Sequence, residues 1–337
     1  MLPDANSQLE FEWFQKWFAA LVDNIGQVVK GKRQEVGVTV LALFAGGHVL
    51  LEDYPGTGKT TLAKAMAASV QGSWNRIQFT PDLLPTDVTG GMIFNQRENH
   101  FRFHAGPIFA NIVLADEINR ASPKTQSALL QVMEEGQVTV DGRTYDVPGT
   151  ADPHTGAASG PFIVLATQNP IEQEGTYRLP EAQLDRFMVK LALGYPGHDA
   201  EVDMLRTVGA GYGAADIQPI VKISQVGQMI AAVRTVHLED TIRSYIVRLC
   251  QHTRAALPEV RLGVSPRGAV ALMSMARAVA AAQGRTYVTV DDVRTMAPYV
   301  MAHRLLLTPS AELERVSAAD LVARTLDAVA QPESLRV

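Results

Sequence analysis

The feature that most constrains this 337-residue chain is a glycine-rich segment between a short apolar run and a helical pattern. The segment is Asp53-Tyr54-Pro55-Gly56-Thr57-Gly58-Lys59-Thr60, and it follows the apolar run His48–Leu51. Glycines let backbone N–H groups point at phosphate groups, and the positive end of the following helix adds to the attraction. The sequence therefore predicts a P-loop, with Lys59 on the β- and γ-phosphates and the Thr60 hydroxyl on Mg²⁺. The residues expected to contact the phosphates are Pro55, Gly56, Thr57, Gly58, Lys59, Thr60 and Thr61.

The first position of this loop departs from the usual pattern. A full P-loop begins with glycine, whereas this chain has Asp53. A carboxylate close to a triphosphate would repel it. We therefore expect the Asp53 side chain to point away from the phosphates and to accept hydrogen bonds from nearby backbone N–H groups.

Polar residues follow two further apolar runs. Asp116 and Glu117 come directly after the run Ile112–Ala115, and their types suit Mg²⁺ binding by Asp116 and polarisation of the attacking water by Glu117. Asn169 follows the run Phe162–Ala166. Because parallel strands present their carboxyl ends at one edge, we expect Asn169 near the same phosphates, where it could orient the water or sense the γ-phosphate. An asparagine before proline is also a common turn residue, and that alternative stays open.

From about Val36 to Lys190, four short apolar runs alternate with helical patterns. Such alternation predicts an α/β fold, in which a parallel sheet lies between two layers of helices. After Tyr195-Pro196 only helical periodicity continues, which predicts a smaller, all-helical C-terminal domain. The four expected strands are His48–Leu51, Arg76–Phe79, Ile112–Ala115 and Phe162–Ala166.

The domain boundaries follow from these patterns. Residues 1–27 carry aromatic and aliphatic side chains at three- and four-residue spacing and should form a helix that packs on the core. Residues 28–195 should form the α/β core, and residues 196–337 the helical domain. The Ser-Pro pairs Ser122-Pro123 and Ser265-Pro266 predict helix starts, with serine as N-cap. Within the core we expect two hairpins at about 90–104 and 137–147, the second around Asp141-Gly142, and a mobile Gly/Pro-rich surface loop at 148–161.

Composition and charge narrow the function classes. The formal net charge is −5, and we find no long Lys/Arg run, so nucleic acid is a disfavoured partner. The uncharged apolar run Val36–Leu51 is interrupted and too short to cross a bilayer, so no membrane insertion is expected. A single cysteine, Cys250, permits no internal disulfide, and no signal peptide is visible. These features favour a soluble, cytoplasmic protein.

Several longer stretches resemble the MoxR-type AAA+ ATPases, a clade with an insert in helix 2 that is related to the motor subunits of magnesium chelatases. The similarity runs from about Val28 to beyond Arg304. The stretches that carry it are Leu51–Thr60, Gly106–Phe109, Asp116–Gln126, Ala166–Tyr177 and Leu179–Phe187.

The resemblance implies a role for each candidate residue. Lys59 and Thr60 would belong to Walker A, Asp116 and Glu117 to Walker B, and Asn169 would be sensor 1. Arg186 would be an arginine finger that acts on a neighbouring subunit, and Arg267 would be sensor 2, which swings the helical lid onto the nucleotide. Val28, Val29 and Gly31 would line the adenine pocket, and the two hairpins would face the centre of a ring.

Together these inferences predict Mg²⁺-dependent ATP hydrolysis that drives the remodelling or activation of a protein partner. The resemblance implies a homo-oligomeric ring, expected to be a hexamer, and a partner that often contains a von Willebrand factor A domain. Three alternatives stay open: the motor of a metal-chelatase-like complex, a DNA-tracking ring, and a nucleotide-gated scaffold without hydrolysis. The acidic net charge argues against DNA, and salt-dependent DNA affinity would revive it. A scaffold should lack Glu117 or Arg186, and both are present.

Overall fold

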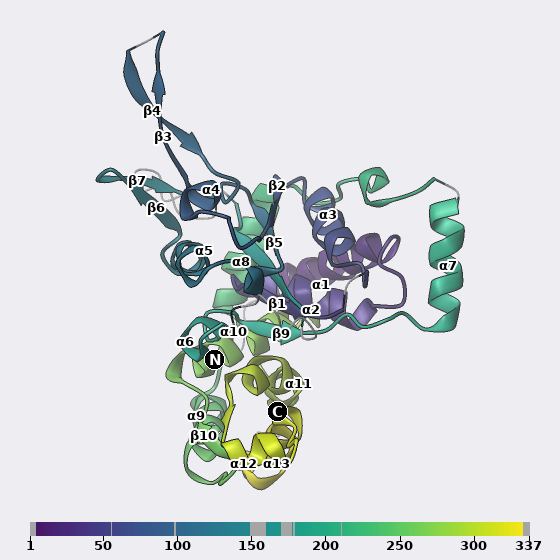
Figure 1. The fold of residues 1–337 in the computed structure, drawn as a ribbon. Coiled ribbons are helices and arrows are strands. Elements are labelled where there is room, and N and C mark those ends of the chain that lie inside the picture. The colour runs from purple at the N-terminus through teal and green to yellow at the C-terminus, as the bar shows by residue number, and fades with distance from the viewer. Residues whose placement is uncertain are drawn as a thin grey trace.

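A five-stranded parallel sheet forms the centre of the molecule (Figure 1). The computed structural model describes residues 5–54, 56–97, 99–148, 160–169, 177, 179–209 and 211–332, and side chains from residue 11 onward. The four predicted strands are confirmed, and a fifth, β9, was not predicted. In spatial order the strands are β2 (Trp74–Gln78), β5 (Ile112–Asp116), β8 (Ile163–Gln168), β1 (Val49–Glu52) and β9 (Val189–Leu191).

Alternate residues of the strands enter two different hydrophobic clusters. Val49 and Leu51 of β1 join a cluster with helices α1 (Ala5–Gly26), α2 (Arg33–Ala45) and α3 (Lys59–Ser69). Leu50 joins the other cluster, which includes α5 (Pro123–Glu135). Since successive side chains of a strand point to opposite faces, the sheet is covered on both sides, as the predicted three-layer core requires.

The N-terminal helix packs on the core, as its spacing predicts. Phe14 and Ile25 of α1 are fully buried, and Trp13 and Trp17 are half-buried against the same cluster. Phe14 meets Phe44 of α2 edge to face, with 5.0 Å between ring centroids. The aromatic stripe of this helix is therefore core packing. None of the described helices is both long enough and apolar enough to span a membrane.

Both predicted hairpins are present. The first consists of β3 (Gly90–Asn95) and β4 (His100–Ala105), follows the short helix α4 (Pro85–Thr89), and extends far from the body of the molecule (Figure 1). The second consists of β6 (Gln137–Val140) and β7 (Arg143–Asp146), and its Asp141-Gly142 turn has positive φ at both residues, as a two-residue hairpin loop prefers. Most of the predicted loop at 148–161 lies outside the described residues.

The chain beyond β9 is mainly helical. A two-stranded pair, β10 (Val260–Leu262) with β11 (Leu306–Leu307), is the exception to the all-helical prediction. Both predicted serine N-caps are confirmed: Ser122 Oγ accepts from Thr125 N–H (3.3 Å), and Ser265 Oγ accepts from Gly268 N–H (3.2 Å). The helices are α7 (His198–Gly209), α8 (Ile223–Thr235), α9 (Asp240–Ala255), α10 (Pro266–Ala282), α11 (Val290–Met301), α12 (Pro309–Leu313) and α13 (Ala318–Ala328).

The helical segment does not have a core of its own. Helices α8 and α10 pack against α2, and one apolar cluster continues from α1 and α2 into α9, α10, α11 and α13. Helices α9 and α11 to α13 gather at the end of the molecule away from the β3–β4 hairpin (Figure 1). A domain boundary at residue 195 therefore stays a prediction, because the chain after it wraps back onto the α/β core before it reaches the lid helices.

Candidate active site

The P-loop follows β1 and leads into α3, as the sequence predicts. Gly56 and Gly58 both have positive φ, 83° and 93°, and a Cβ added at either would meet nothing within 4 Å. Lys59 is the first residue of α3, and its ammonium donates to the carbonyl oxygens of Asp53 (2.9 Å) and Tyr54 (2.8 Å). The loop thus offers an open backbone surface beside a lysine, which suits a phosphate chain. Pro55 lies outside the described residues.

Asp53 points away from this surface, as expected. Its Oδ1 accepts from the Tyr54 N–H (2.8 Å) and its Oδ2 from the Gly194 N–H (2.7 Å), and the residue is almost fully buried. The Tyr54 ring stacks on Tyr195, with 6.0 Å between ring centroids. Hence the start of the P-loop is attached to the chain that follows β9.

The segment expected to line an adenine pocket lies close to the same chain. Gly31 has a φ of 69°, and a Cβ added to it would lie 2.6 Å from the Ala200 Cβ at the start of α7. Lys32 Nζ donates to the carbonyl oxygen of Tyr195 (2.8 Å). Val29 is buried and Val28 half-buried in the adjoining cluster. The three candidate residues therefore lie near the P-loop shoulder, and their contact with adenine stays a prediction.

The Asp116 carboxylate ends β5 and has two partners from neighbouring strands. Its Oδ1 accepts from Thr167 Oγ1 (2.6 Å), and its Oδ2 accepts from the Nε (3.1 Å) and Nη2 (2.6 Å) of the Arg76 guanidinium. Arg76 lies on β2 and Thr167 on β8. Sequence reasoning missed both residues, because neither belongs to a local motif.

Glu117 follows in a left-handed conformation, with φ 57° and ψ 48°. Its Oε2 accepts hydrogen bonds from Gln78 Nε2 (2.8 Å) and from an Arg120 amine nitrogen (2.9 Å). Arg120 ends the short 3-10 helix Ile118–Arg120 that follows Glu117. The two acids therefore have different sets of partners, and their expected division of roles stays a prediction.

Electrostatics place the lysine and the acids in one site. Burial lowers the pKa of the Lys59 ammonium, and the charges of Asp53, Asp116 and Glu117 oppose that shift. Arg76 and Arg120 form ion pairs with Asp116 and Glu117, so together with Lys59 three cations face the three carboxylates. A bound triphosphate would add negative charge to this site, and a divalent cation would offset it.

Asn169 follows β8 and is mostly buried. The backbone carbonyl oxygen of Asn169 accepts from Asn119 Nδ2 at 3.5 Å. The backbone carbonyl oxygen of Asn119 accepts from the Tyr177 N–H (2.7 Å). The buried Gln126 amide donates to the carbonyl oxygens of Ile118 (3.1 Å), Ala121 (3.2 Å) and Tyr177 (3.2 Å). Asn119 and Gln126 therefore join the segment after Glu117 to the segment after β8, a structural role that the motif alone did not reveal. Residues 170–176 and 178 are outside the described part of the chain.

The residues present suit Mg²⁺ together with nucleotide. In the described ranges, no group of three or more His, Cys, Asp or Glu side chains could hold a metal alone. Thr60 and Asp116 would contribute two oxygen ligands. This small number fits Mg²⁺, which usually keeps several waters and takes other ligands from substrate phosphates.

The two candidate arginines meet at another place. Arg186 follows the short helix α6 (Glu181–Leu184), and the Nη2 of its guanidinium lies 3.0 Å from Glu134 Oε2. Arg267, on the first turn of α10, forms an ion pair with the other oxygen, Glu134 Oε1. Arg186 lies on the predicted core and Arg267 on the predicted lid, yet both contact one carboxylate at the end of α5.

This carboxylate lies at the edge of the sheet opposite the P-loop. Met133 precedes Glu134, and its carbonyl oxygen accepts from His48 Nε2 (3.0 Å). His48 lies directly before β1, whereas the P-loop follows the other end of that strand. The strand separates the two places by roughly 16 Å, at 3.3 Å per residue. In this arrangement of the lid, Arg267 therefore does not form the expected contact at the P-loop of its own chain, and its role at the nucleotide stays a prediction.

Comparisons with known proteins identify the family of the chain. The family model of ATPases associated with various cellular activities (AAA) matches residues 48–189, and the AAA lid domain model matches residues 252–325. The chain is 48% identical to the uncharacterized protein YeaC of Bacillus subtilis, over 92% of this chain and 93% of that protein. It is 40% identical to chaperone MoxR1 of Mycobacterium tuberculosis, over 92% of this chain and 81% of that protein.

A solved structure shares the whole fold. The crystal structure of a protein from Cytophaga hutchinsonii, assigned as an ATPase, superposes with a TM-score of 0.88 at 36% identity. The alignment covers 97% of this chain and 98% of that one.

Proposed function

The chain belongs to the MoxR-type AAA+ ATPases, and from that premise we propose that it hydrolyses Mg²⁺-bound ATP at the contact between two subunits of a ring, to remodel a protein partner. ATPase activity follows from the family. The division of the catalytic site between subunits, the metal and the mechanical output are the proposal.

One observation carries the division of the site. Arg186 and Arg267 share Glu134 at the edge of the sheet that lies away from the P-loop. Arginine is the side chain best suited to the charge that develops on a transferred phosphoryl group. Since neither arginine lies at the P-loop of its own chain, a second subunit has to supply them. The P-loop edge of one chain and the Glu134 edge of the next would then form a head-to-tail contact, which closes into a ring.

Within one chain, the P-loop residues would bind the phosphates. The backbone N–H groups of Gly56 and Gly58 and the Lys59 ammonium would surround the β- and γ-phosphates, and Lys59 would exchange its two carbonyl partners for phosphate oxygens. Thr60 and Asp116 would hold Mg²⁺, which supplies positive charge to the phosphates when bound. Arg76 holds one Asp116 oxygen at 2.6 Å and so fixes the orientation of that carboxylate.

Glu117 would act on the water. It takes a proton from the attacking water, whose oxygen bonds to the γ-phosphorus while the bond to the bridging oxygen breaks, so that ADP and phosphate leave. Gln78 and Arg120 now hold its carboxylate. Asn169, at the end of β8, would orient the same water or sense the γ-phosphate.

The β3–β4 hairpin supports a protein as the target of the mechanical work. Ile93, Phe94 and Phe101 are largely exposed near its tip, and the Phe94 and Phe101 rings lie 5.2 Å apart. Neighbouring exposed apolar side chains are typical of interaction sites, among them contacts with other proteins. The family resemblance makes a partner with a von Willebrand factor A domain the first candidate.

Assembly and hydrolysis can be tested together. We expect the specific ATPase activity of the parent to rise with protein concentration in step with ring formation, as measured by sedimentation velocity. Arg186→Ala should bind ATP like the parent and hydrolyse almost none, whereas the exposed Arg324→Ala on α13 should behave like the parent. Full activity in isolated monomers would contradict the shared site.

The partner is tested separately. Glu117→Gln with ATP should retain a purified von Willebrand factor A domain protein from the same genome, and Phe101→Ser in that background should lose it. Retention of DNA with a steep dependence on salt, or of a tetrapyrrole-processing complex, would instead favour one of the alternative outputs.

A further inference from the structure

Arg186 and Arg267 both form ion pairs with the carboxylate of Glu134. Arg186 takes Oε2 of Glu134 and Arg267 takes Oε1, so each guanidinium holds one oxygen of a single carboxylate. Two guanidiniums at this spacing can also hold two oxygens of one phosphoryl group. A joint contact with one phosphoryl group would require the fold to hold the two guanidiniums at this spacing, although Arg186 and Arg267 are far apart in the sequence.

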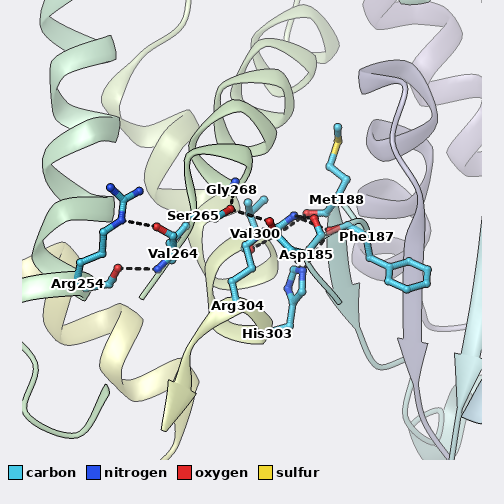
Figure 2. Close-up of polar contacts among 11 residues, drawn as sticks. Asp185, Phe187, Met188, Arg254, Val264, Ser265, Gly268, Val300, His303 and Arg304 are labelled. Carbon is cyan, nitrogen blue, oxygen red and sulfur yellow. Dashed lines mark hydrogen bonds and ion pairs between the residues drawn. The ribbon is translucent and has the colours of Figure 1, made fainter. Parts of the chain in front are cut away.

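The residues just before the two arginines are joined directly. Asp185 precedes Arg186, and its Oδ2 accepts from the Ser265 hydroxyl (2.8 Å), two residues before Arg267 (Figure 2). The same hydroxyl oxygen accepts from the Gly268 N–H (3.2 Å) and so begins α10. One serine thus connects the start of the Arg267 helix to the backbone next to Arg186.

Arg304 holds that backbone in place. Its Nε donates to Asp185 Oδ1 (2.7 Å), and its amine nitrogens donate to the carbonyl oxygens of Asp185 (3.1 Å), Phe187 (2.6 Å) and Met188 (3.2 Å), as Figure 2 shows. These acceptors lie on both sides of Arg186. Arg304 itself is buried, at 8% exposure, and comes from the 3-10 helix Ala302–Arg304 of the lid.

Arg304 packs closely against the first turn of α10. A Cβ added to Gly268 on the first turn of α10 would lie 2.8 Å from Arg304 Cδ. A buried guanidinium is costly unless its donors are paired. Here most of them are paired with the segment that carries Arg186, and one also donates to the Val300 carbonyl oxygen of α11. The lid also contains the ion pair Arg285–Asp292 at 2.6 Å, in which Asp292 is buried and Arg285 is 22% exposed, and the printed side-chain hydrogen bonds of Arg285 stay within the lid. A close arginine–carboxylate pair in the lid therefore does not in itself involve residues 185–188.

We propose that Arg304 is a positioning residue for ATP hydrolysis, which acts through Asp185 and Ser265 to set the spacing of Arg186 and Arg267 so that both reach one phosphoryl group of the neighbouring subunit. The inference rests on the proposed shared site. It adds that the two arginines work as one unit, and that a third arginine, which touches neither substrate nor metal, determines their geometry.

The test mixes two inactive chains, Arg186→Ala and Lys59→Ala, and adds the substitution Arg304→Lys to one of them at a time. Arg186→Ala keeps an intact P-loop, and Lys59→Ala keeps intact arginines, so mixed rings should recover activity. Arg304→Lys keeps the charge and loses the planar fork. The Lys59→Ala chain supplies the arginines. In that chain we expect Arg304→Lys to reduce the recovered ATPase activity by about tenfold or more, because small misplacements of catalytic groups have large effects on rate. In the Arg186→Ala chain it should leave that activity within about twofold.

Controls separate positioning from folding. Arg285→Lys should have no effect in either chain. Ser265→Ala removes a helix cap worth about 1 kcal/mol and the hydroxyl that donates to Asp185, and we expect it to fold. Like Arg304→Lys, it should reduce the recovered activity only in the Lys59→Ala chain. Ser317→Ala, which removes the matching cap of α13, should not reduce it in either chain. In the otherwise intact chain, Arg304→Lys should lower kcat and leave the ATP dissociation constant unchanged.

The outcomes are distinguishable. Equal losses in both placements, or no loss in either, would overturn the positioning role while the recovered activity of the simple pair still supports the shared site. If mixed rings of the simple pair form, as shown by co-purification through two tags, and stay inactive, the proposed shared site fails and this inference fails with it.

Discussion

Gln78 Nε2 donates a 2.8 Å hydrogen bond to Glu117 Oε2, from the end of β2 to the residue that follows β5. A carboxylate held in this way is less free to accept a proton from water. Arg120 contacts the same oxygen at 2.9 Å, so the Glu117 carboxylate is fixed from two sides.

Removing the glutamine contact should raise the basal rate. We expect Gln78→Leu to increase basal turnover up to about tenfold, the equivalent of roughly 1.5 kcal/mol for one hydrogen bond to a charged group. The measurement is steady-state phosphate release, with ATP affinity unchanged. Gln131→Leu, which removes a similar glutamine contact to Glu135 on α5, serves as control. A fall in turnover at unchanged affinity would mean that Gln78 orients Glu117 for catalysis instead.

Lys59→Ala should abolish nucleotide binding. The ammonium lies at the open P-loop surface, and without it the backbone N–H groups face three phosphates with no compensating side-chain charge. Calorimetry with ATP and Mg²⁺ measures this directly. Lys64→Ala on the same helix, whose ammonium lies 5.2 Å from the centre of the Trp74 ring, should bind like the parent. Near-normal affinity of Lys59→Ala would show that another cation binds the phosphates.

Glu117→Gln should separate binding from hydrolysis. The amide keeps the size of the side chain and cannot take a proton from water, so turnover should fall by at least about 10²-fold. ATP and Mg²⁺ should still bind, as measured by calorimetry, because Lys59, Thr60 and Asp116 are unchanged. Glu135→Gln at the end of α5 is the matched control. Retained phosphate release would place the base elsewhere.

His48 should make the stability of the fold depend on pH. Burial lowers the pKa of its imidazole from 6.5 to about 4, and the hydrogen bond to the Met133 carbonyl oxygen opposes this shift. The neutral ring accepts from the Val164 N–H (3.0 Å) and donates to Met133, next to Glu134. Above pH 6.5 the ring is neutral in both states. Between pH 6.5 and 4 only the unfolded state binds the proton, so the free energy of unfolding should decrease by about 3 kcal/mol as the pH falls.

A His48→Gln variant isolates this contribution, since an amide can also accept from Val164 and donate to Met133. Urea denaturation at several pH values should show a steeper loss of stability in the parent than in the variant between pH 6.5 and 4. Parallel curves for the two proteins would show that His48 has a normal pKa.

Local patterns in the sequence predicted much of this architecture. The P-loop, the acids after β5, the Asp141-Gly142 hairpin and both serine caps depend on residues that are neighbours in the chain, and each of them is found. Strand β9 was missed because it is three residues long and has a lysine, Lys190, at its centre. That lysine forms an ion pair with Glu52 of the adjacent β1.

The partners of the site residues could not be predicted in the same way. Arg76, Gln78 and Thr167 reach the acids only because β2 and β8 flank β5, and strand order leaves no local mark in the sequence. Glu134 resembles any exposed acid at a helix end. Arg304 and Asp185 are 119 residues apart, so their contact, like the position of Arg267 beside Arg186, exists only in the folded chain.

Mixing two inactive chains tests the shared site most directly. Arg186→Ala and Lys59→Ala should each be inactive alone. If the arginines of one chain serve the P-loop of the next, ATPase activity should appear on mixing, depend on the mixing ratio, and be greatest when both chains are abundant. Arg267→Ala in place of Arg186→Ala should give the same recovery. Mixed rings that demonstrably contain both chains and still hydrolyse no ATP would contradict the account.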